Sequence, residues 1–478
     1  MFVNNNLKDF KEVSEITQKN MFRTSFFAIL LVLISCKPPD NPKKDFLHWV
    51  KKGEINNNVI CKDDQSLSYC LYIPINYNID TSFAIIYCFD PKGDGRLPVS
   101  LFKDIAEEYG YIVVGSNNSR NGIQSAEISH ITEVLLQDTK TKLSIDPKRI
   151  YLAGFSGGAR VACSMALNSN SMAGVIACSA GFDPASTQAN FNFIGIAGNE
   201  DMNYLEMKQL ESSLTNWQGK HQFIVFNGNH HWPPQRILEQ AISTLELFSM
   251  KEKLIARNEK VIRDFITERS DRTNELEREN NIDSLARDFQ LIQNMKKTLY
   301  GLVNVPEISL KENALMQSAA LKAYIEKEDE IEKNEVVKQQ AFVQAYTSKQ
   351  NDWWKKEIND LYNISKNNKD AIEKRSARRL LAFISLMSYS YVNSSLSQQN
   401  FNACGHFLQI YGMADPDNPD YFYFSACYLA NSGNIPKAFD NLKKAISFGF
   451  SDRTKLENDP LIANLRSLDG FSELLKTK

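Results

Sequence analysis

Residues 149–168 read RIYLAGFSGGARVACSMALN, and this stretch decides the fold. The run from Ile150 to Phe155 is apolar throughout, as expected of a strand that is buried on both faces of a parallel sheet. Residues 157–168 have the apolar spacing of a helix. The five residues GFSGG (154–158) between them form a G-x-S-x-G motif, which places a serine on a sharp strand-to-helix turn. We therefore expect the Ser156 hydroxyl to be exposed at the head of the helix, although a plain turn can have the same sequence.

The same alternation of strand and helix extends through residues 58–250. The expected strands are 84–89, 111–116, 149–155, 173–179, 193–198 and 221–227, and the expected helices are 99–109, 124–143, 157–168, 203–217 and 234–249. Residues 58–73 read as a hairpin with a polar tip. Strands that alternate with helices indicate a mostly parallel sheet with right-handed crossovers. We therefore predict an α/β fold whose chemistry lies at the carboxyl ends of the strands.

Composition and charge exclude several classes of protein. The 478 residues suggest two or three domains. A hydrophobic content of 43% and a charged content of 23% exclude fibrous, low-complexity and multi-span membrane classes. The 55 basic and 57 acidic residues leave a net charge of −2, so no nucleic-acid partner is expected. Of the 21 glycines, 15 lie before residue 251, which indicates an α/β part followed by a helical part.

The second half is expected to be all helical, with a helical domain at 251–375 and repeats at 376–478. Residues 420–450 resemble a tetratricopeptide repeat because small and apolar residues recur at its helix-packing positions: Ala426, Gly433, Ala438, Leu442 and Ala445. A second, degenerate unit is expected around 376–415. Fewer than three units cannot form a free-standing solenoid. We therefore predict a compact C-terminal module that offers a surface for a protein partner.

Two loops after late strands contain the acid and the base that a serine nucleophile needs. Residues 198–204 read GNEDMNY, and residues 228–234 read GNHHWPP. Both loops are expected on the same rim of the sheet as Ser156. The chain order of serine, acid and histidine distinguishes α/β hydrolases from other folds with a serine triad.

On these motifs the chain resembles the α/β-hydrolase superfamily, in particular secreted serine esterases of the polyhydroxybutyrate-depolymerase and feruloyl-esterase type. The resemblance covers roughly residues 58–250 and rests on AGFSGGA, GNEDMN and GNHHWPP, the last in place of a GGHEWP pattern. It implies Asp201 as the acid and His230 as the base, with Glu200 and His231 as the neighbouring alternatives. No metal or organic cofactor is implied.

Two backbone N–H groups are expected to bind the developing oxyanion. The N–H of Gly157 lies at the positive end of a helix. The second donor is expected in the loop after the strand at 84–89, where the sequence departs from the common His-Gly pattern. Because Pro91 has no N–H, this donor is the backbone of Asp90 or of Lys92.

Three further side chains are candidates for contacting the substrate: Asn118, Arg120 and Trp232. Arg120 is the one cation in the loop at 117–122 and could bind a carboxylate or a polar acyl group. The same loop can instead be a turn in which Asn and Ser side chains bond to nearby backbone.

The N-terminal region reads as a targeting signal. Residues 21–37 are MFRTSFFAILLVLISCK, with an apolar run at 26–34 that spans only about 14 Å as a helix, under half of the roughly 30 Å hydrocarbon core. This favours a signal peptide over a transmembrane anchor. The run ends in LISC, which resembles the lipobox of bacterial lipoproteins and implies lipidation of Cys36; an ordinary signal peptide is the alternative. Residues 1–36 are thus an upstream extension and a lipoprotein signal, and 37–57 a linker.

A lipid anchor implies a location in the cell envelope, on the periplasmic or the cell-surface side. Such a location permits disulfides, and Cys61 and Cys70 at the hairpin are a candidate pair. The predicted function is a lipid-anchored serine hydrolase that cleaves carboxylic esters through an acyl-enzyme, a peptidase being the less favoured variant. The alternative is a non-catalytic surface lipoprotein that binds a protein or a glycan through its helical repeats.

Overall fold

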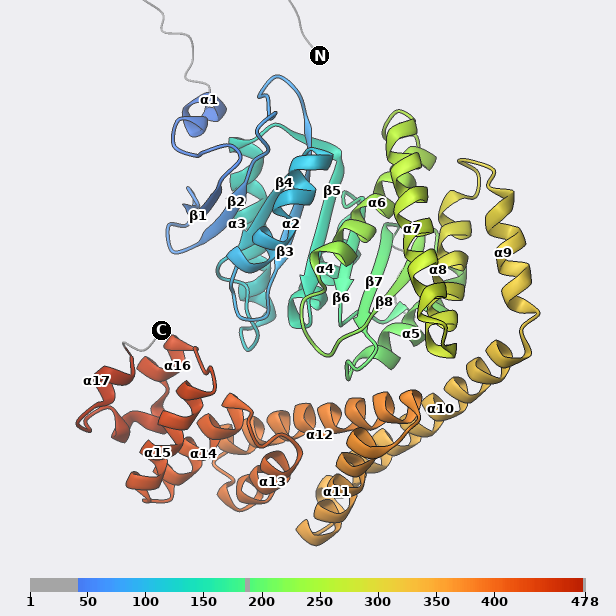
Figure 1. Cartoon of the computed structure of the whole chain (residues 1–478). Coiled ribbons are helices and arrows are strands. Elements are labelled where there is room, and N and C mark those ends of the chain that lie inside the picture. Colours follow the sequence, from blue (N-terminus) through green and yellow to red (C-terminus); the bar gives the residue numbers. More distant parts are fainter. Residues whose placement is uncertain (1–41, 185–189, 476–478) are drawn as a thin grey trace, which may run out of the picture. The chain divides into compact units, whose positions relative to one another are not determined.

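The computed structural model describes residues 42–184 and 190–475, and these contain an eight-stranded sheet (Figure 1). The strand order is β1-β2-β4-β3-β5-β6-β7-β8. The strands are β1 (Ile55–Ile60), β2 (Ser68–Tyr72), β3 (Phe83–Phe89), β4 (Tyr111–Ser116), β5 (Ile145–Phe155), β6 (Gly174–Cys178), β7 (Asn192–Gly198) and β8 (His221–Phe226). The β1–β2 and β2–β4 pairs are antiparallel, and the other neighbours are parallel. The predicted α/β fold with a mostly parallel sheet is confirmed.

Helices cover both faces of this sheet. One face packs against α3 (Ser125–Lys142), α4 (Gly157–Leu167) and α5 (Tyr204–Ser213), and the other against α2 (Arg96–Tyr109) and α6 (Gln235–Lys251). Successive residues of a strand point to opposite faces. Tyr87 of β3 therefore lies in the first core, whereas its neighbours Ile86 and Cys88 lie in the second. Strands buried on both sides explain why the sequence shows continuous apolar runs.

The predicted linker at 37–57 is wrong for its second half. Residues Pro42–Leu47 form the helix α1, and β1 already begins at Ile55. Phe46 and Val50 are buried in the core that contains α3 and α4. Proline and lysine residues suggested a solvated tether, but these two apolar side chains anchor the segment to the folded part.

The candidate disulfide between Cys61 and Cys70 is also wrong. Both residues are free and buried. Cys61 lies in the core on one face of the sheet, and Cys70 lies in the core on the other face. In the hairpin Cys61 pairs with Leu67, three residues before Cys70, and the two cysteine side chains enter cores on opposite faces of the sheet.

The chain after α6 is helical, as predicted. Its helices are α7 (Glu259–Glu279), α8 (Ile282–Leu299), α9 (Pro306–Met316), α10 (Ala319–Ser348), α11 (Asn351–Asn367), α12 (Ala371–Ser397), α13 (Phe401–Ala414), α14 (Pro419–Asn431), α15 (Ile435–Ser447), α16 (Arg453–Asn458), η3 (Pro460–Leu465) and α17 (Phe471–Leu474). An apolar cluster joins Leu247 and Met250 of α6 to Phe265 of α7 and Met295 of α8. The sheet and the first helices after it therefore share buried side chains.

The last helices have a core of their own, which includes residues from Phe342 to Phe471. Ala426 of α14 and Ala438, Leu442 and Ala445 of α15 are fully buried in it. Small residues at these positions let the two helices pack closely, which is consistent with the tetratricopeptide resemblance. The repeat assignment and the domain boundaries near 250 and 375 stay predictions.

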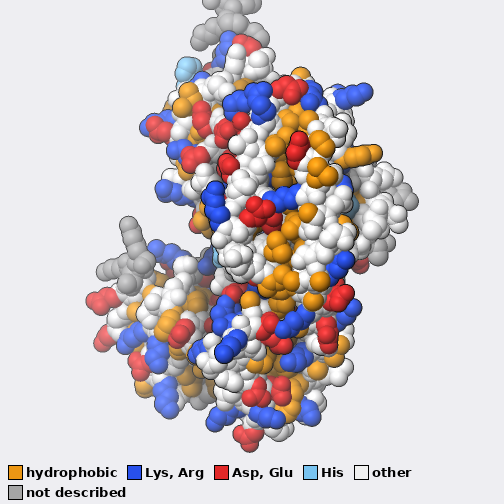
Figure 2. Space-filling model, turned by 45° about the vertical axis from the view of Figure 1, so that its right-hand side comes forward, with side chains coloured by type: hydrophobic (Ala, Val, Ile, Leu, Met, Phe, Trp, Pro, Cys, Tyr) orange, Lys and Arg blue, Asp and Glu red, His pale blue; other side chains and the backbone are white. Residues whose placement is uncertain are grey.

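The predicted signal peptide, its Cys36 and the upstream extension lie outside the described residues. In the part of the chain that is described, no helix has the length and apolar character needed to cross a bilayer. Figure 2 shows side chains of both charges interspersed over one face of the molecule, with apolar side chains between them. This face therefore presents no broad basic patch, in keeping with the small net charge.

Candidate active site

Ser156 lies on the sharp turn between β5 and α4. Its backbone has φ 51° and ψ −120°, a positive φ that residues other than glycine seldom adopt. The turn is held by the Ser156 N–H, which donates to the carbonyl of Cys178 on β6 at 2.8 Å. Strained backbone of this kind clusters at functional sites, where the surrounding structure holds it in place.

Two positions of the motif require glycine, because neighbouring backbone lies where a Cβ atom would be. A Cβ on Gly158 would lie 2.0 Å from the carbonyl oxygen of Phe89, and one on Gly154 would lie 2.3 Å from the carbonyl oxygen of Gly158. Neither position has room for a side chain. The motif therefore packs α4 directly against the ends of β3 and β5 and leaves the serine at the turn.

A continuous chain of hydrogen bonds joins Ser156, His230 and Asp201. Nε2 of His230 is 3.0 Å from Oγ of Ser156. Nδ1 of His230 is 3.0 and 3.1 Å from the two carboxylate oxygens of Asp201. Asp201 is fully buried, and its Oδ1 also accepts the N–H of Asn203 at 2.8 Å. The imidazole packs against the ring of Phe155, with 4.7 Å between the ring centroids.

The neighbouring alternatives point elsewhere. Glu200 forms an ion pair with Arg378 of α12. Nδ1 of His231 is 2.6 Å from the carbonyl oxygen of Trp232, and its ring lies beside Phe226. We call residues 198–204 the acid loop and residues 227–234 the histidine loop. Asp201 and His230 are the members of these loops that form the hydrogen-bonded chain to Ser156.

The expected second oxyanion donor lies in the loop after β3. The N–H of Lys92 donates to Oδ1 of Asp90 at 2.8 Å, so this amide already has a partner. That bond favours the backbone N–H of Asp90 over that of Lys92 as a donor to substrate. The loop is paired with its neighbour on the rim, because Asn121 N–H donates to the carbonyl of Pro91 at 2.8 Å.

All three candidates for substrate contact have hydrogen-bond partners within the protein. Asn118 Oδ1 accepts the N–H of Ser68, and its Nδ2 donates to the carbonyl of Ser66, so both ends of this side chain bind hairpin backbone. Trp232 is buried rather than exposed at the rim. Arg120 is exposed, and its Nη1 donates to the hydroxyl of Thr454 on α16 at 3.2 Å. The turn alternative therefore describes Asn118 better than substrate binding does.

One residue at the site was not singled out from the sequence. Oδ1 of Asn121 lies only 1.8 Å from the place where Gly157 would have a Cβ, so the amide group of Asn121 covers the first residue of α4. Its only signal was an Asn-Gly pair in a polar loop, which is also typical of a simple turn. Asn121 is therefore a polar side chain directly beside the expected oxyanion site.

The thiol that lies beside the serine turn is that of Cys178, which is fully buried. Burial raises the pKa of the Cys178 thiol well above its usual range, so this side chain beside the serine turn stays protonated. Within the described ranges, 42–184 and 190–475, no group of His, Cys, Asp and Glu side chains is arranged to bind a metal ion.

Residues 113–249 match the sequence model of a family described as phospholipase/carboxylesterase. The part of the chain built around the sheet therefore has an α/β-hydrolase fold, and over residues 113–249 it is similar to this family. A search of curated proteins finds no match.

The chain also matches solved structures of hydrolases and esterases at low identity. An S-formylglutathione hydrolase from Staphylococcus aureus is 13% identical, with 42% of this chain and 97% of that chain covered and a TM-score of 0.33. The Bacillus cereus carboxylesterase is 17% identical, with 39% and 96% covered and a TM-score of 0.32. A ferulic acid esterase is 16% identical, with 41% and 98% covered and a TM-score of 0.32.

Proposed function

We propose that this protein is a serine hydrolase that cleaves carboxylic esters through an acyl-enzyme. The observation on which the proposal rests is the unbroken hydrogen-bond chain from Oγ of Ser156 through both nitrogens of His230 to the buried Asp201 carboxylate. Such an arrangement turns an ordinary hydroxyl into a nucleophile. It also favours an enzyme over a non-catalytic binding protein, which would not need all three groups in contact.

In the first half-reaction, Oγ of Ser156 attacks the ester carbonyl carbon, and Nε2 of His230 takes the hydroxyl proton. Asp201 accepts a hydrogen bond from Nδ1–H and stabilises the imidazolium that forms. The N–H groups of Gly157 and Asp90 donate to the carbonyl oxygen as it becomes negative. Collapse of the tetrahedral intermediate breaks the ester bond, and His230 returns the proton to the leaving alcohol.

The second half-reaction releases the acid. Water attacks the acyl-enzyme while His230 accepts one of its protons, and the second tetrahedral intermediate is stabilised by the same two N–H groups. When it collapses, the proton returns to Oγ of Ser156 and the carboxylic acid leaves. The matched phospholipase/carboxylesterase family supports an ester as the bond that is cleaved.

Hydrolysis of 4-nitrophenyl butyrate tests this proposal. We expect the full chain to release nitrophenol and to form a butyryl ester on Ser156 that mass spectrometry detects after an acid quench. Ser156→Ala should do neither. Equal turnover by the folded Ser156→Ala variant would show that another group performs the reaction.

We further propose that the enzyme is attached to a membrane by a lipid on Cys36. The support is the sequence LISC at residues 33–36 after a short apolar run. Cys36→Ala should then release the protein from the membrane fraction of its native host. If the variant stays in the membrane fraction like the wild type, the lipid anchor is excluded.

A further inference from the structure

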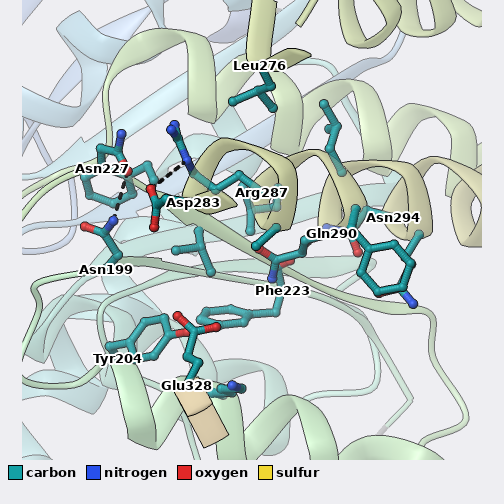
Figure 3. Close-up of a pocket in the computed structure, with 18 of the residues that line it drawn as sticks. Asn199, Tyr204, Phe223, Asn227, Leu276, Asp283, Arg287, Gln290, Asn294 and Glu328 are labelled. Atoms are coloured by element: carbon teal, nitrogen blue, oxygen red, sulfur yellow. Dashed lines mark hydrogen bonds and ion pairs between the residues drawn. The ribbon is translucent and has the colours of Figure 1, made fainter. Parts of the chain in front are cut away.

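The acid loop and the histidine loop are bonded to each other, chiefly through Asn199. Its N–H donates to the carbonyl of Phe226 at 2.9 Å, and its Oδ1 accepts the N–H of Gly228 at 3.3 Å. Its Nδ2 donates to Oδ1 of Asn227 at 2.9 Å, as Figure 3 shows. Through Asn199 the two loops that contain Asp201 and His230 therefore form one hydrogen-bonded unit.

A buried arginine from the helical part of the chain holds this unit. Nη1 of Arg379, on α12, donates to the carbonyl of Asn199 at 2.7 Å, although the two residues are 180 positions apart. The other guanidinium nitrogens donate to Glu335 of α10, at 2.9 and 3.1 Å from Nε and 2.6 Å from Nη2. Arg379 and Glu335 are 2% and 1% exposed, and the guanidinium lies 4.8 Å from the ring centre of Tyr204.

This environment fixes the guanidinium. A planar group with paired bonds to a carboxylate has little freedom of orientation. Glu335 and Tyr204 hold Arg379 in one position, so its remaining N–H group is directed at the carbonyl of Asn199. The neighbouring Arg378 pairs with Glu200 of the same loop, but Arg378 is exposed and such pairs contribute little.

A cavity adjoins the acid loop and the histidine loop. Its volume is about 550 Å³, and Arg379 is among the residues that line it. Figure 3 shows Asn199, Asn227, Tyr204 and Phe223 in its wall. Close packing normally holds a loop in place. Next to the cavity, hydrogen bonds such as the one from Arg379 have to do so instead.

We infer that Arg379 is a positioning residue for the active site, which fixes the acid and histidine loops so that Asp201 and His230 align with Ser156. This inference rests on the proposed serine-hydrolase function. It follows that α10 and α12 help to position the catalytic residues. The helical part is therefore more than an appended binding module. Small misalignments of catalytic groups reduce turnover steeply, so the effect should appear in kcat.

The double variant Arg379→Met/Glu335→Met tests this inference in the full chain. Removing both partners leaves no buried unpaired charge, so the fold is expected to survive. The matched control is Lys208→Met/Glu332→Met, which removes another ion pair, 2.7 Å long, between α5 and α10; the Lys208 ammonium pairs with Glu332 and Asp329, both on α10. Arg379→Lys is a second test variant, because lysine keeps the charge but not the forked geometry.

We expect the Arg379→Met/Glu335→Met variant to lose roughly ten- to a hundred-fold in kcat for 4-nitrophenyl butyrate, with a nearly unchanged KM. The downfield proton resonance of the His230–Asp201 hydrogen bond should shift or broaden in the same variant. Arg379→Lys should show a smaller change of the same kind. The Lys208→Met/Glu332→Met control should match the wild type in both measurements.

A folded double variant with wild-type kcat and a wild-type resonance would overturn the inference. If the double variant does not fold, Arg379→Lys decides by the same two measurements. The resonance reports the hydrogen bond whether or not an ester is turned over. If the wild type shows no ester turnover that depends on Ser156, the proposed function is refuted. The resonance would still test the role of Arg379 in that case.

Discussion

The indole Nε1–H of Trp232 donates a hydrogen bond to Oδ2 of Asp90 at 2.8 Å and so joins the histidine loop to the loop of the expected oxyanion donor. The other oxygen of the Asp90 side chain accepts the N–H of Lys92. Trp232 also packs against Phe155, at 5.8 Å between ring centroids, directly before the nucleophile. One buried carboxylate therefore links the loop that contains the base to the backbone that is expected to hold the oxyanion.

Trp232→Phe should weaken this link. The variant keeps an aromatic ring but leaves one oxygen of the buried Asp90 without its donor, which destabilises a fold by about 1–3 kcal/mol. We expect a lower free energy of unfolding in urea and a several-fold lower kcat. Trp217→Phe is the control, because its indole N–H bonds the carbonyl of Phe191 away from the site. If both variants lower kcat equally, the link to Asp90 has no special role.

Gly158→Ala should be among the most harmful changes of one methyl group in this chain. The new Cβ would collide with the backbone carbonyl oxygen of Phe89. Neither atom can rotate away, because each is attached directly to buried backbone. Overpacking of this kind destabilises a protein by about 1–3 kcal/mol and sometimes more. Gly122→Ala has open space around its Cβ. Its free energy of unfolding should fall only by the cost of placing alanine at a positive φ, about 1–2 kcal/mol. Thermal unfolding of the two variants gives the comparison.

The three bonded residues should respond to substitution as a unit. His230→Ala should lower kcat/KM for 4-nitrophenyl butyrate about as much as Ser156→Ala, because losses within a triad do not add. Asp201→Asn should lower it somewhat less, since the imidazole keeps a partner but prefers the wrong tautomer. His231→Ala should stay within about tenfold of the wild type. If His231→Ala abolished turnover while His230→Ala remained active, the assignment of His230 as the base would be contradicted.

Cys61 and Cys70 should behave as unreactive thiols. Burial raises the pKa of each to about 12, with a further contribution from Asp138 at Cys61, so almost no thiolate exists at pH 8. Iodoacetamide should leave both unmodified in the native protein and modify both after unfolding in urea. A Cys61–Cys70 peptide linked by a disulfide, found by mass spectrometry without reductant, would contradict this account.

The sheet and the serine turn could be predicted because their signals are local. Continuous apolar runs mark strands that are buried on both faces, and GFSGG marks the turn at Ser156 wherever such a strand meets a helix. The two loops followed from their position at the ends of late strands, and the resemblance to α/β-hydrolase esterases then implied Asp201 and His230 within them. The helical second half followed from the scarcity of glycine and the spacing of its apolar residues.

Other features depend on contacts between distant residues, which no local pattern reports. Trp232 was expected to contact substrate, but its indole N–H bonds Asp90, 142 residues away. The hydrogen bond from Arg379 to Asn199 joins a helix and a loop that belong to two different predicted domains. The polar neighbours of Phe46 and Val50 favour a solvated linker, although the core of the sheet buries both side chains.

The most direct test of the central claim is labelling of the purified full chain with a fluorophosphonate probe, followed by mass spectrometry of the modified peptide. The probe reacts with a serine only when a base activates its hydroxyl. The proposed mechanism predicts one labelled site at Ser156 and no labelling in a folded Ser156→Ala variant. A folded wild type that stays unlabelled, or equal labelling of the Ser156→Ala variant, would contradict it.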